Sequence, residues 1–105
     1  SGGEAQRVGI VRALINSPDV VFGDEPTGAL NSSGSAAVLD VFTDVNQAGQ
    51  SVVMVTHDMK SARRGNRIIY LRDGYICGEC DLGTYISGDQ ARHEKLRSFL
   101  NEMGW

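Results

Sequence analysis

Two short apolar segments on either side of a helical segment constrain the fold of this chain most strongly. Residues 20–22 read Val-Val-Phe, and residues 52–56 read Val-Val-Met-Val-Thr. A wholly apolar run of this length is typical of a strand that is buried on both faces of a parallel sheet. Residues 32–47 predict a helix, because apolar side chains recur there at helical spacing: Val38, Leu39, Phe42 and Val45. A strand, a helix and a second strand in this order predict a parallel sheet with a right-handed crossover.

The segment before the first strand also predicts a helix, over residues 4–16. Pro18 ends this helix, because the residue before a proline avoids helical geometry. Its apolar side chains form one face, which we expect to pack against the rest of the domain: Val8, Val11, Leu14 and Ile15.

End signals bound the helices around the second strand. For the helix over 32–47, we expect Ser32 or Ser33 as the N-terminal cap and Gly49 just past the end. A short helix of about residues 58–64 is predicted after the second strand, opened by the aspartate at its first position.

A hairpin is predicted further along the chain. Residues 68–71 and 75–77 are rich in β-forming side chains, and Asp73-Gly74 between them is a strong hairpin turn signal. Cys77 and Cys80 lie in this strand-like run, so their side chains point to opposite faces and we expect two reduced, structural cysteines. A zinc site is disfavoured, because no second pair of ligands accompanies them.

The last predicted element is a helix of about residues 89–103. The preceding Ser87-Gly88-Asp89-Gln90 resembles a capping box, and Gly104 stands where a C-terminal cap would. Its apolar stripe comprises Leu96, Phe99, Leu100 and Met103. The elements together predict an α/β fold: a mostly parallel sheet with flanking helices, followed by a C-terminal β-hairpin and helix.

Size and charge exclude several classes of function. At 105 residues, the chain has room for one domain or a part of one. The net charge of −3 and the lack of a basic stretch argue against general nucleic-acid binding. We expect the cluster Arg63-Arg64 with Arg67 to be a solvated helix end, and a contact to a partner or phosphate is the alternative. The apolar runs are too short to span a membrane and no signal-peptide pattern is present, which predicts a cytosolic location.

Candidate chemical groups follow each of the two apolar strands. Asp24 and Glu25 come directly after the first, and His57 comes directly after the second. Ligands bind at the carboxyl ends of parallel strands, where an aspartate can hold Mg²⁺ through water and a glutamate can deprotonate an attacking water. A solvated acidic turn and a capped or core histidine are the alternatives when each segment is taken alone.

The first residues of the chain form a second candidate site. Ser1-Gly2-Gly3-Glu4 opens the first predicted helix. Glycines there allow a backbone to approach a ligand closely, and the free N–H groups and helix dipole favour an anion. Taken alone, the same residues are more typical of a flexible tag.

Taken together and in this order, these segments resemble the ATP-binding cassette (ABC) ATPases. Residues 1–14 resemble the signature motif and its helix, and residues 18–27 resemble the Walker B strand. Residues 28–31 resemble the D-loop, and residues 56–58 resemble the segment with the switch histidine. The likeness continues through residues 72–74 and covers most of the chain up to about residue 80. The string of residues 24–31 is typical of one subgroup, the ATPases of lipoprotein-releasing, macrolide-export and bacitracin-resistance systems.

The resemblance implies roles for individual residues. Asp24 would help to hold Mg²⁺, Glu25 would polarise the hydrolytic water, and His57 would contact the γ-phosphate of ATP. Two ATPase domains would pair head to tail, with Asn31 of the D-loop at the dimer interface. The residues that would close over the ATP of the opposite domain are Ser1, Gly2, Gly3 and Glu4. The further partners implied are membrane permease subunits, at the cytoplasmic face of the cell membrane.

The sequence departs from the family pattern in important places. The phosphate loop with its lysine and the glutamine loop do not occur in it, and the D-loop ends in Asn31 where many members have aspartate. Residues 1–105 are therefore interpreted as a single partial domain, the C-terminal part of a P-loop NTPase domain, and we expect the isolated chain to be inactive and to self-associate through exposed strand edges. Two alternatives stay open: a DNA-repair or translation factor of the same superfamily, and a truncated chain without enzymatic function.

Overall fold

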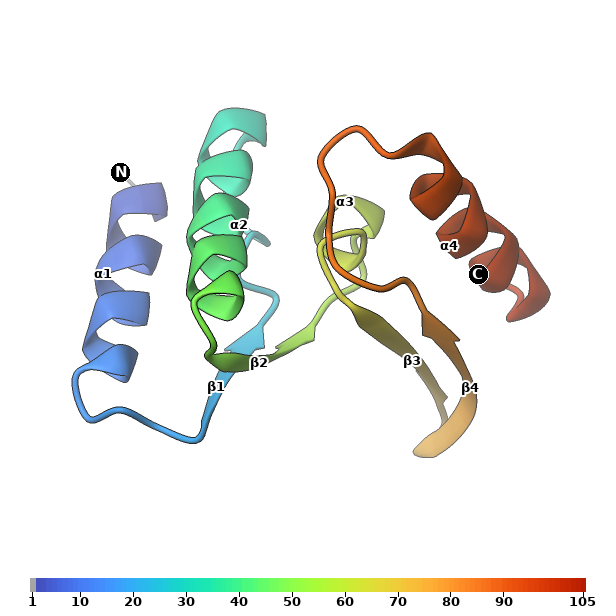
Figure 1. The fold of residues 1–105 in the computed structure, drawn as a ribbon, viewed down its shortest axis with the longest axis horizontal. Coiled ribbons are helices and arrows are strands. Elements are labelled where there is room, and N and C mark those ends of the chain that lie inside the picture. Colours follow the sequence, from blue (N-terminus) through green and yellow to red (C-terminus); the bar gives the residue numbers. More distant parts are fainter. Residues whose placement is uncertain (1) are drawn as a thin grey trace. The chain divides into compact units, whose positions relative to one another are not determined.

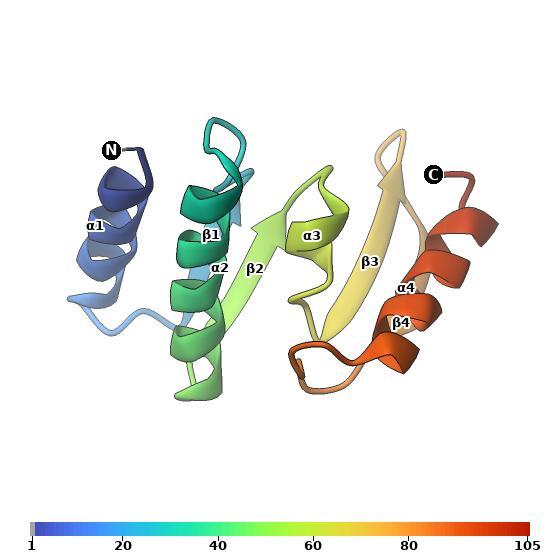
Figure 2. The same cartoon turned by 90° about the horizontal axis from the view of Figure 1, so that it is seen from above.

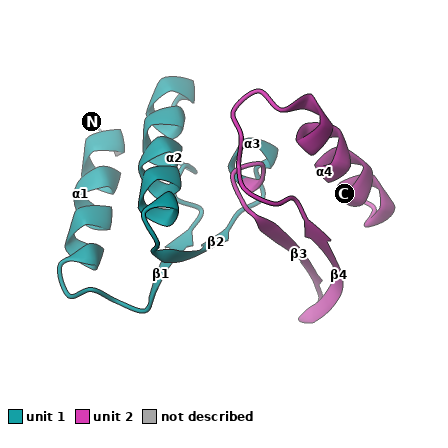
Figure 3. Cartoon of the chain, viewed as in Figure 1, with its two compact units in different colours: residues 1–61 teal, residues 62–105 magenta. Residues whose placement is uncertain are grey.

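The computed structural model describes residues 2–105 and divides the chain into two compact units, residues 1–61 and residues 62–105 (Figure 3). The helices and strands of the first unit are α1 (Gly2–Leu14), β1 (Val20–Asp24), α2 (Ser32–Gln47) and β2 (Ser51–Val55). A short helix, α3 (Met59–Ala62), lies at the junction of the two units. Those of the second unit are β3 (Arg67–Arg72), β4 (Tyr75–Asp81) and α4 (Gln90–Glu102). No helix within the described part of the chain is both long and apolar enough to cross a membrane.

The first unit confirms the predicted strand–helix–strand order and its parallel pairing. β1 pairs with β2 in parallel, and Val21 lies opposite Val52. α1 and α2 run side by side and in the same direction (Figures 1 and 2). The core between helices and strands is formed by Ile10, Val21, Val38 and Phe42, with Leu14, Leu30, Val41, Val45, Val52 and Met54 packed against it.

Only one face of this two-stranded sheet is covered in the first unit, so the expectation of strands buried on both faces is wrong here. Alternate residues of β1 and β2 face the helices, as the pleat of a strand requires. The side chains on the opposite face stay between 43% and 66% exposed, because no element of residues 2–61 packs over them: Val20, Phe22, Val53 and Val55.

The apolar face predicted for α1 is also wrong. Val8, Val11 and Ile15 are more than half exposed, whereas Ile10 is buried and Leu14 packs on the core. The reason is the close approach of α1 to α2: a methyl group on Gly3 would lie only 3.6 Å from the Cα of Gly34. The inward stripe therefore starts at Gly3 and continues through positions 7, 10 and 14, while the three apolar side chains with the same spacing point outward.

The N-terminal cap of α2 is Asn31 rather than either predicted serine. Its backbone is extended (φ −74°, ψ 175°), and its side-chain oxygen accepts a hydrogen bond from the Gly34 amide at 2.8 Å. This is the geometry of an N-cap, in which a short polar side chain satisfies an amide that has no partner within the helix. At the other end, Gly49 (φ +108°) follows the helix, as predicted.

The helix after β2 forms at the predicted place but is short. Asp58 opens it, since its Oδ1 accepts from the Lys60 amide at 3.0 Å. The helix ends at Ala62, so the cluster Arg63, Arg64 and Arg67 belongs to the following turn and strand. The expectation of a helix end is therefore wrong, although Arg67 is exposed as expected. Each of these arginines contacts another side chain of the second unit, respectively His93, the ring of Tyr85, and Glu79.

The second unit confirms the predicted hairpin. β3 and β4 are antiparallel, and Asp73 (φ +52°) and Gly74 (φ +80°) form the two-residue turn between them. A register shift after Tyr70 marks a β-bulge in this pair. Cys77 is exposed and Cys80 is buried, and both thiols are free, as expected from their positions in one strand.

α4 packs on the hairpin through Leu96, Phe99 and Leu100, which are buried. Its N-terminal cap is Asp89, whose Oδ1 accepts from the Arg92 amide at 3.2 Å, so the capping box predicted to start at Ser87 is wrong. The helix ends as predicted, with Gly104 in the left-handed region (φ +82°).

Arg92 is a buried charged residue of this unit that the sequence did not single out. It is only 8% exposed, and its guanidinium donates to the carbonyl oxygens of Arg63, Gly65 and Gly83. It also lies over the ring of Tyr85, 5.2 Å from the centroid. Burial lowers the pKa of Arg92, while Tyr85 and Asp89 oppose that shift. This side chain therefore fastens the turn after α3 and the loop after β4 to α4 by charge-assisted hydrogen bonds.

Candidate functional site

The carboxyl ends of β1 and β2 lie at one edge of the sheet, because the two strands are parallel. Asp24 ends β1 opposite Val55, the last residue of β2, and the Glu25 amide donates to the Val55 carbonyl oxygen at 2.7 Å. Glu25 itself has φ +47°, in the left-handed region that residues other than glycine rarely adopt. Such conformations occur often at functional sites, where the surrounding contacts hold them.

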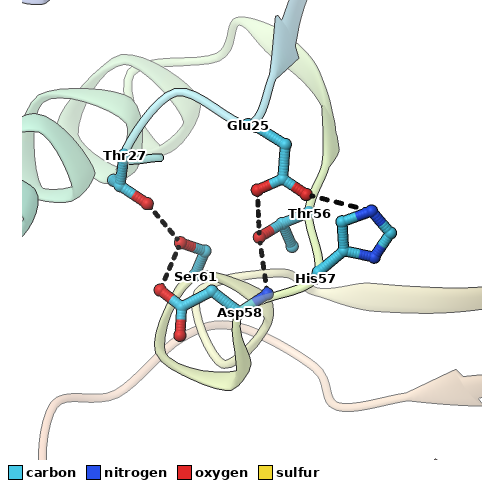
Figure 4. Close-up of polar contacts among 6 residues, drawn as sticks. All are labelled: Glu25, Thr27, Thr56, His57, Asp58 and Ser61. Carbon is cyan, nitrogen blue, oxygen red and sulfur yellow. Dashed lines mark hydrogen bonds and ion pairs between the residues drawn. The ribbon is translucent and has the colours of Figure 1, made fainter. Parts of the chain in front are cut away.

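The side chain of Glu25 points toward the loop after β2 (Figure 4). Its Oε2 accepts a hydrogen bond from the Thr56 hydroxyl at 3.4 Å, and its Oε1 lies 3.6 Å from His57 Nε2. The second separation is too long for a hydrogen bond, so within the described residues the buried Oε1 has no hydrogen-bond partner. A buried carboxylate oxygen without a partner is uncommon and has to be explained by function or by an absent group.

The structure thus brings Glu25 and His57 together, as the strand order predicted. The two side chains differ in exposure: that of Glu25 is 33% exposed and that of His57 is 90% exposed. His57 can therefore swing away from the carboxylate at little cost, which would open Oε1 to a water molecule or to another donor.

Asp24 lies at the same edge but on the uncovered face of the strand, with Val20 and Phe22. Carboxylate oxygen is the ligand type that Mg²⁺ prefers, and Mg²⁺ in phosphate-binding sites is held by one or two carboxylates together with water and phosphate oxygens. Asp24 fits that pattern. Residues 2–105 hold no group of three or more histidine, cysteine, aspartate or glutamate side chains that could bind a metal by themselves.

A second hydrogen-bond chain ties the two loops of this edge together, and sequence reasoning did not predict it. The Ser61 hydroxyl lies 3.1 Å from Thr27 Oγ1 and donates to Asp58 Oδ2 at 3.2 Å (Figure 4). Because Ser61 has a single hydroxyl proton, Thr27 must be the donor to Ser61. The Asp58 amide in turn donates to Thr56 Oγ1 at 3.0 Å, so one chain of contacts leads from Thr27 to Glu25.

The other predicted site residues that the structure describes lie at the amino ends of α1 and α2. Ser1 is outside the described residues. Gly2, Gly3 and Glu4 form the first turn of α1, and Gly3 is buried against α2. Gly3 lies against Gly34 of α2, and a methyl group on Gly34 would lie 3.2 Å from Oδ1 of Asn31. The cap of α2 is therefore close to the first turn of α1. Two helix amino ends therefore lie side by side, which makes the surrounding potential favourable for an anion.

A small hollow separates α1 from β1. Its volume is about 160 Å³, and its lining includes Gln6, Gly9, Phe22, Asp24 and Pro26. Sites that enclose a drug-sized ligand are larger, roughly 300–1,000 Å³. This hollow alone therefore does not accommodate a nucleotide.

Comparisons with known proteins are consistent with this geometry. No protein-family model matches the sequence. Over 79 residues, or 75% of the chain, it is 53% identical to the macrolide export ATP-binding/permease protein MacB of Escherichia coli and 48% identical to the lipoprotein-releasing system ATP-binding protein LolD of Aquifex aeolicus. These matches span 12% of MacB and 35% of LolD, so the chain corresponds to a minor part of either relative.

Solved structures with a similar fold also belong to ATP-binding cassettes. The chain is similar to a dimeric ATP-binding cassette in a post-hydrolysis state bound to ADP and phosphate, with a TM-score of 0.67 and 45% identity over 77% of this chain and 35% of that one. A dimeric bacterial ABC transporter cassette matches with the same TM-score and 46% identity over the same shares. In both sequence and fold, the chain therefore corresponds to part of an ATP-binding cassette ATPase.

Proposed function

We propose that this chain is part of an ATP-hydrolysing domain that drives an exporter-type ABC transporter. The observation that supports this proposal most strongly is the Glu25 carboxylate at the strand edge. One of its oxygens is held by Thr56, and the other is buried, without a hydrogen-bond partner and next to an exposed histidine. A carboxylate with one free acceptor at a ligand-binding edge is suited to accept a proton from an attacking water.

The roles of the neighbouring residues follow from their positions. Glu25 orients water through its free oxygen while Thr56 fixes the carboxylate plane. His57, almost fully exposed, can donate a hydrogen bond to an anion that approaches the edge. Asp24 would hold Mg²⁺, which when bound to ATP neutralises charge that develops on the phosphates. The proposed contributions of Gly2, Gly3 and Asn31 rest on the adjacent helix amino ends, and those of Ser1 and Glu4 rest on the family resemblance alone.

The partners proposed are a second ATPase domain in a head-to-tail dimer and membrane permease subunits, which places the chain at the cytoplasmic face of a membrane. The similar cassette structures are dimeric, and MacB is described as an ATP-binding/permease protein. A DNA-repair or translation factor of the same family is the second candidate, but both relatives named above belong to export or release systems.

The experiment that tests the enzymatic proposal is phosphate release from Mg·ATP by the full-length protein that contains this chain. We expect Glu25→Gln to lower the rate by about 10²–10⁴-fold, the usual contribution of a general base, with ATP binding retained. Glu102→Gln, at the exposed end of α4, is the matched control and should leave the rate unchanged. Hydrolysis by Glu25→Gln at the wild-type rate would refute the proposed role.

The uncovered sheet face supports a further part of the proposal, self-association of the isolated chain. Val20, Phe22, Val53 and Val55 are exposed on one face of a sheet with only two strands. Apolar sheet faces and unpaired strand edges bind other chains. We expect concentration-dependent oligomers in light scattering, reduced by Phe22→Ser, whereas a clean monomer at high protein concentration would contradict this expectation.

A further inference from the structure

A cluster of basic side chains in the second unit lies outside the site described above. It consists of Arg63, which follows α3, with His93 and Arg97 on α4. The Arg63 Nη1 atom lies 3.1 Å from His93 Nδ1, and Arg97 Nη2 lies 3.0 Å from His93 Nε2. Two guanidinium groups therefore flank a single imidazole ring, one at each nitrogen.

The hydrogen-bonding capacity of this cluster is unbalanced. A guanidinium can only donate, and a neutral imidazole has one nitrogen that accepts and one that donates. His93 can therefore accept from Arg63 or from Arg97, but not from both. A protonated ring could accept from neither. The cluster thus has more donors than acceptors and lacks an acceptor that serves both guanidinium groups.

The neighbouring carboxylate does not supply that acceptor. Glu94 lies 3.9 Å from Arg97, at the outer limit of an ion pair, and both side chains are more than half exposed. Such a pair is strongly screened by water, so most of the positive charge stays uncompensated.

The cluster is also held in place by the fold. The buried Arg92 donates to the carbonyl oxygen of Arg63 and so fixes the turn after α3 against α4. His93 and Arg97 lie one turn apart on that same helix, so all three side chains project from backbone that is mutually fixed.

We propose that Arg63, His93 and Arg97 form a binding site for a phosphate group. A phosphate carries several acceptor oxygens and up to two negative charges, so one group can accept from both guanidinium forks and match their charge. The same chemistry is offered by two sources, a soluble phosphate compound and the headgroup of an anionic phospholipid. This inference does not depend on ATP hydrolysis at the sheet edge.

Inorganic phosphate is the first probe, titrated into the 105-residue chain while nuclear magnetic resonance spectra are recorded at constant ionic strength. We expect saturable shifts of the signals of the three residues, and at least about tenfold weaker binding in Arg63→Gln/Arg97→Gln because two charge-assisted bonds are lost. Arg67→Gln is the matched control, since Arg67 pairs with Glu79 on the hairpin. His93→Gln, which keeps both guanidinium groups, should bind phosphate more weakly than wild type but better than the double variant.

Equal shifts with chloride in place of phosphate, or unchanged affinity in the double variant, would overturn the site. Vesicles separate the two sources. Cosedimentation with phosphatidylcholine vesicles that contain phosphatidic acid, but not with pure phosphatidylcholine, supports the site and identifies a lipid headgroup. Phosphate binding without cosedimentation supports the site and identifies a soluble ligand.

Discussion

The hydrogen bond between Thr27 and Ser61 gives the sharpest prediction for the strand edge. Both residues are buried, with 6% and 2% of their surfaces exposed, and the bond joins the loop that carries Glu25 to the helix that follows His57. Ser61→Ala removes one partner and leaves the Thr27 hydroxyl buried without an acceptor. Leaving a buried polar group unsatisfied costs about 1–3 kcal/mol, so we expect the free energy of unfolding to fall by about 2 kcal/mol.

Two further variants test the cause of that loss. Thr27→Val should cost less, about 1 kcal/mol, because Ser61 still donates to the exposed Asp58. The double variant leaves no buried hydroxyl without a partner. Its loss of unfolding free energy should therefore be smaller than the sum of the two single losses by about 1 kcal/mol. Ser32→Ala, at an exposed position of α2, is the control and should change stability by less than about 0.5 kcal/mol.

The suitable assay is native-state hydrogen exchange of the amides in β1 and β2, because it reports the stability of the first unit separately from the second. The reasoning is refuted if Ser61→Ala matches the Ser32→Ala control, or if the costs of the two single variants add. Either result would mean that water replaces the lost partner and that this bond does not fix the two loops.

Three other predictions concern packing and caps. Arg92→Met should lower the stability of the second unit by about 3 kcal/mol in urea denaturation followed by tryptophan fluorescence, because the carbonyl groups of Arg63 and Gly65 lose their donor, whereas that of Gly83 keeps Asn66. The exposed Arg97→Met should have little effect. Asn31→Ala should cost about 1 kcal/mol and Asn31→Asp almost nothing, measured by exchange of the amides in the first turn of α2. Gly78→Val should displace α4 and cost about 2 kcal/mol in thermal unfolding, since a side chain there would lie 2.8 Å from Met103 Sδ and 3.2 Å from the ring of the buried Phe99.

The strand and helix order was predictable because its signals are local. The parallel pair of β1 and β2 follows from two apolar runs around one amphipathic helix, and the hairpin follows from Asp73-Gly74 between β-forming residues. The meeting of Glu25 and His57 follows directly, because parallel strands end at one edge.

The inward face of α1 was not predictable from periodicity. Two stripes on this helix have the same spacing, and the sequence offers apolar residues on both. The contact of Gly3 with Gly34 decides between them, and it joins residues on different helices. The sheet face was mispredicted for a related reason: an apolar run shows that a strand can be buried on both faces but does not supply the covering element.

Buried polar contacts were missed because their partners lie far apart in the sequence. Ser61 and Thr27 are 34 residues apart, and Arg92 lies 27 residues from Gly65. A serine in a short helix and an arginine in an amphipathic one are both read as surface residues until the tertiary structure is known. The cap at Asn31 is different, because asparagine before a helical run is itself a local signal that favours it over the serines that follow.

Calorimetric titration of the 105-residue chain with Mg·ATP, up to millimolar nucleotide, tests the central claim most directly. The claim is that Asp24, Glu25 and His57 supply the hydrolytic edge of a site whose phosphate-gripping loop this sequence does not contain. The account predicts no saturable heat from the strand edge, so any heat from phosphate binding at Arg63, His93 and Arg97 should be unchanged in Asp24→Ala. Saturable binding that weakens in Asp24→Ala would contradict it, because the strand edge would then bind Mg·ATP without that loop.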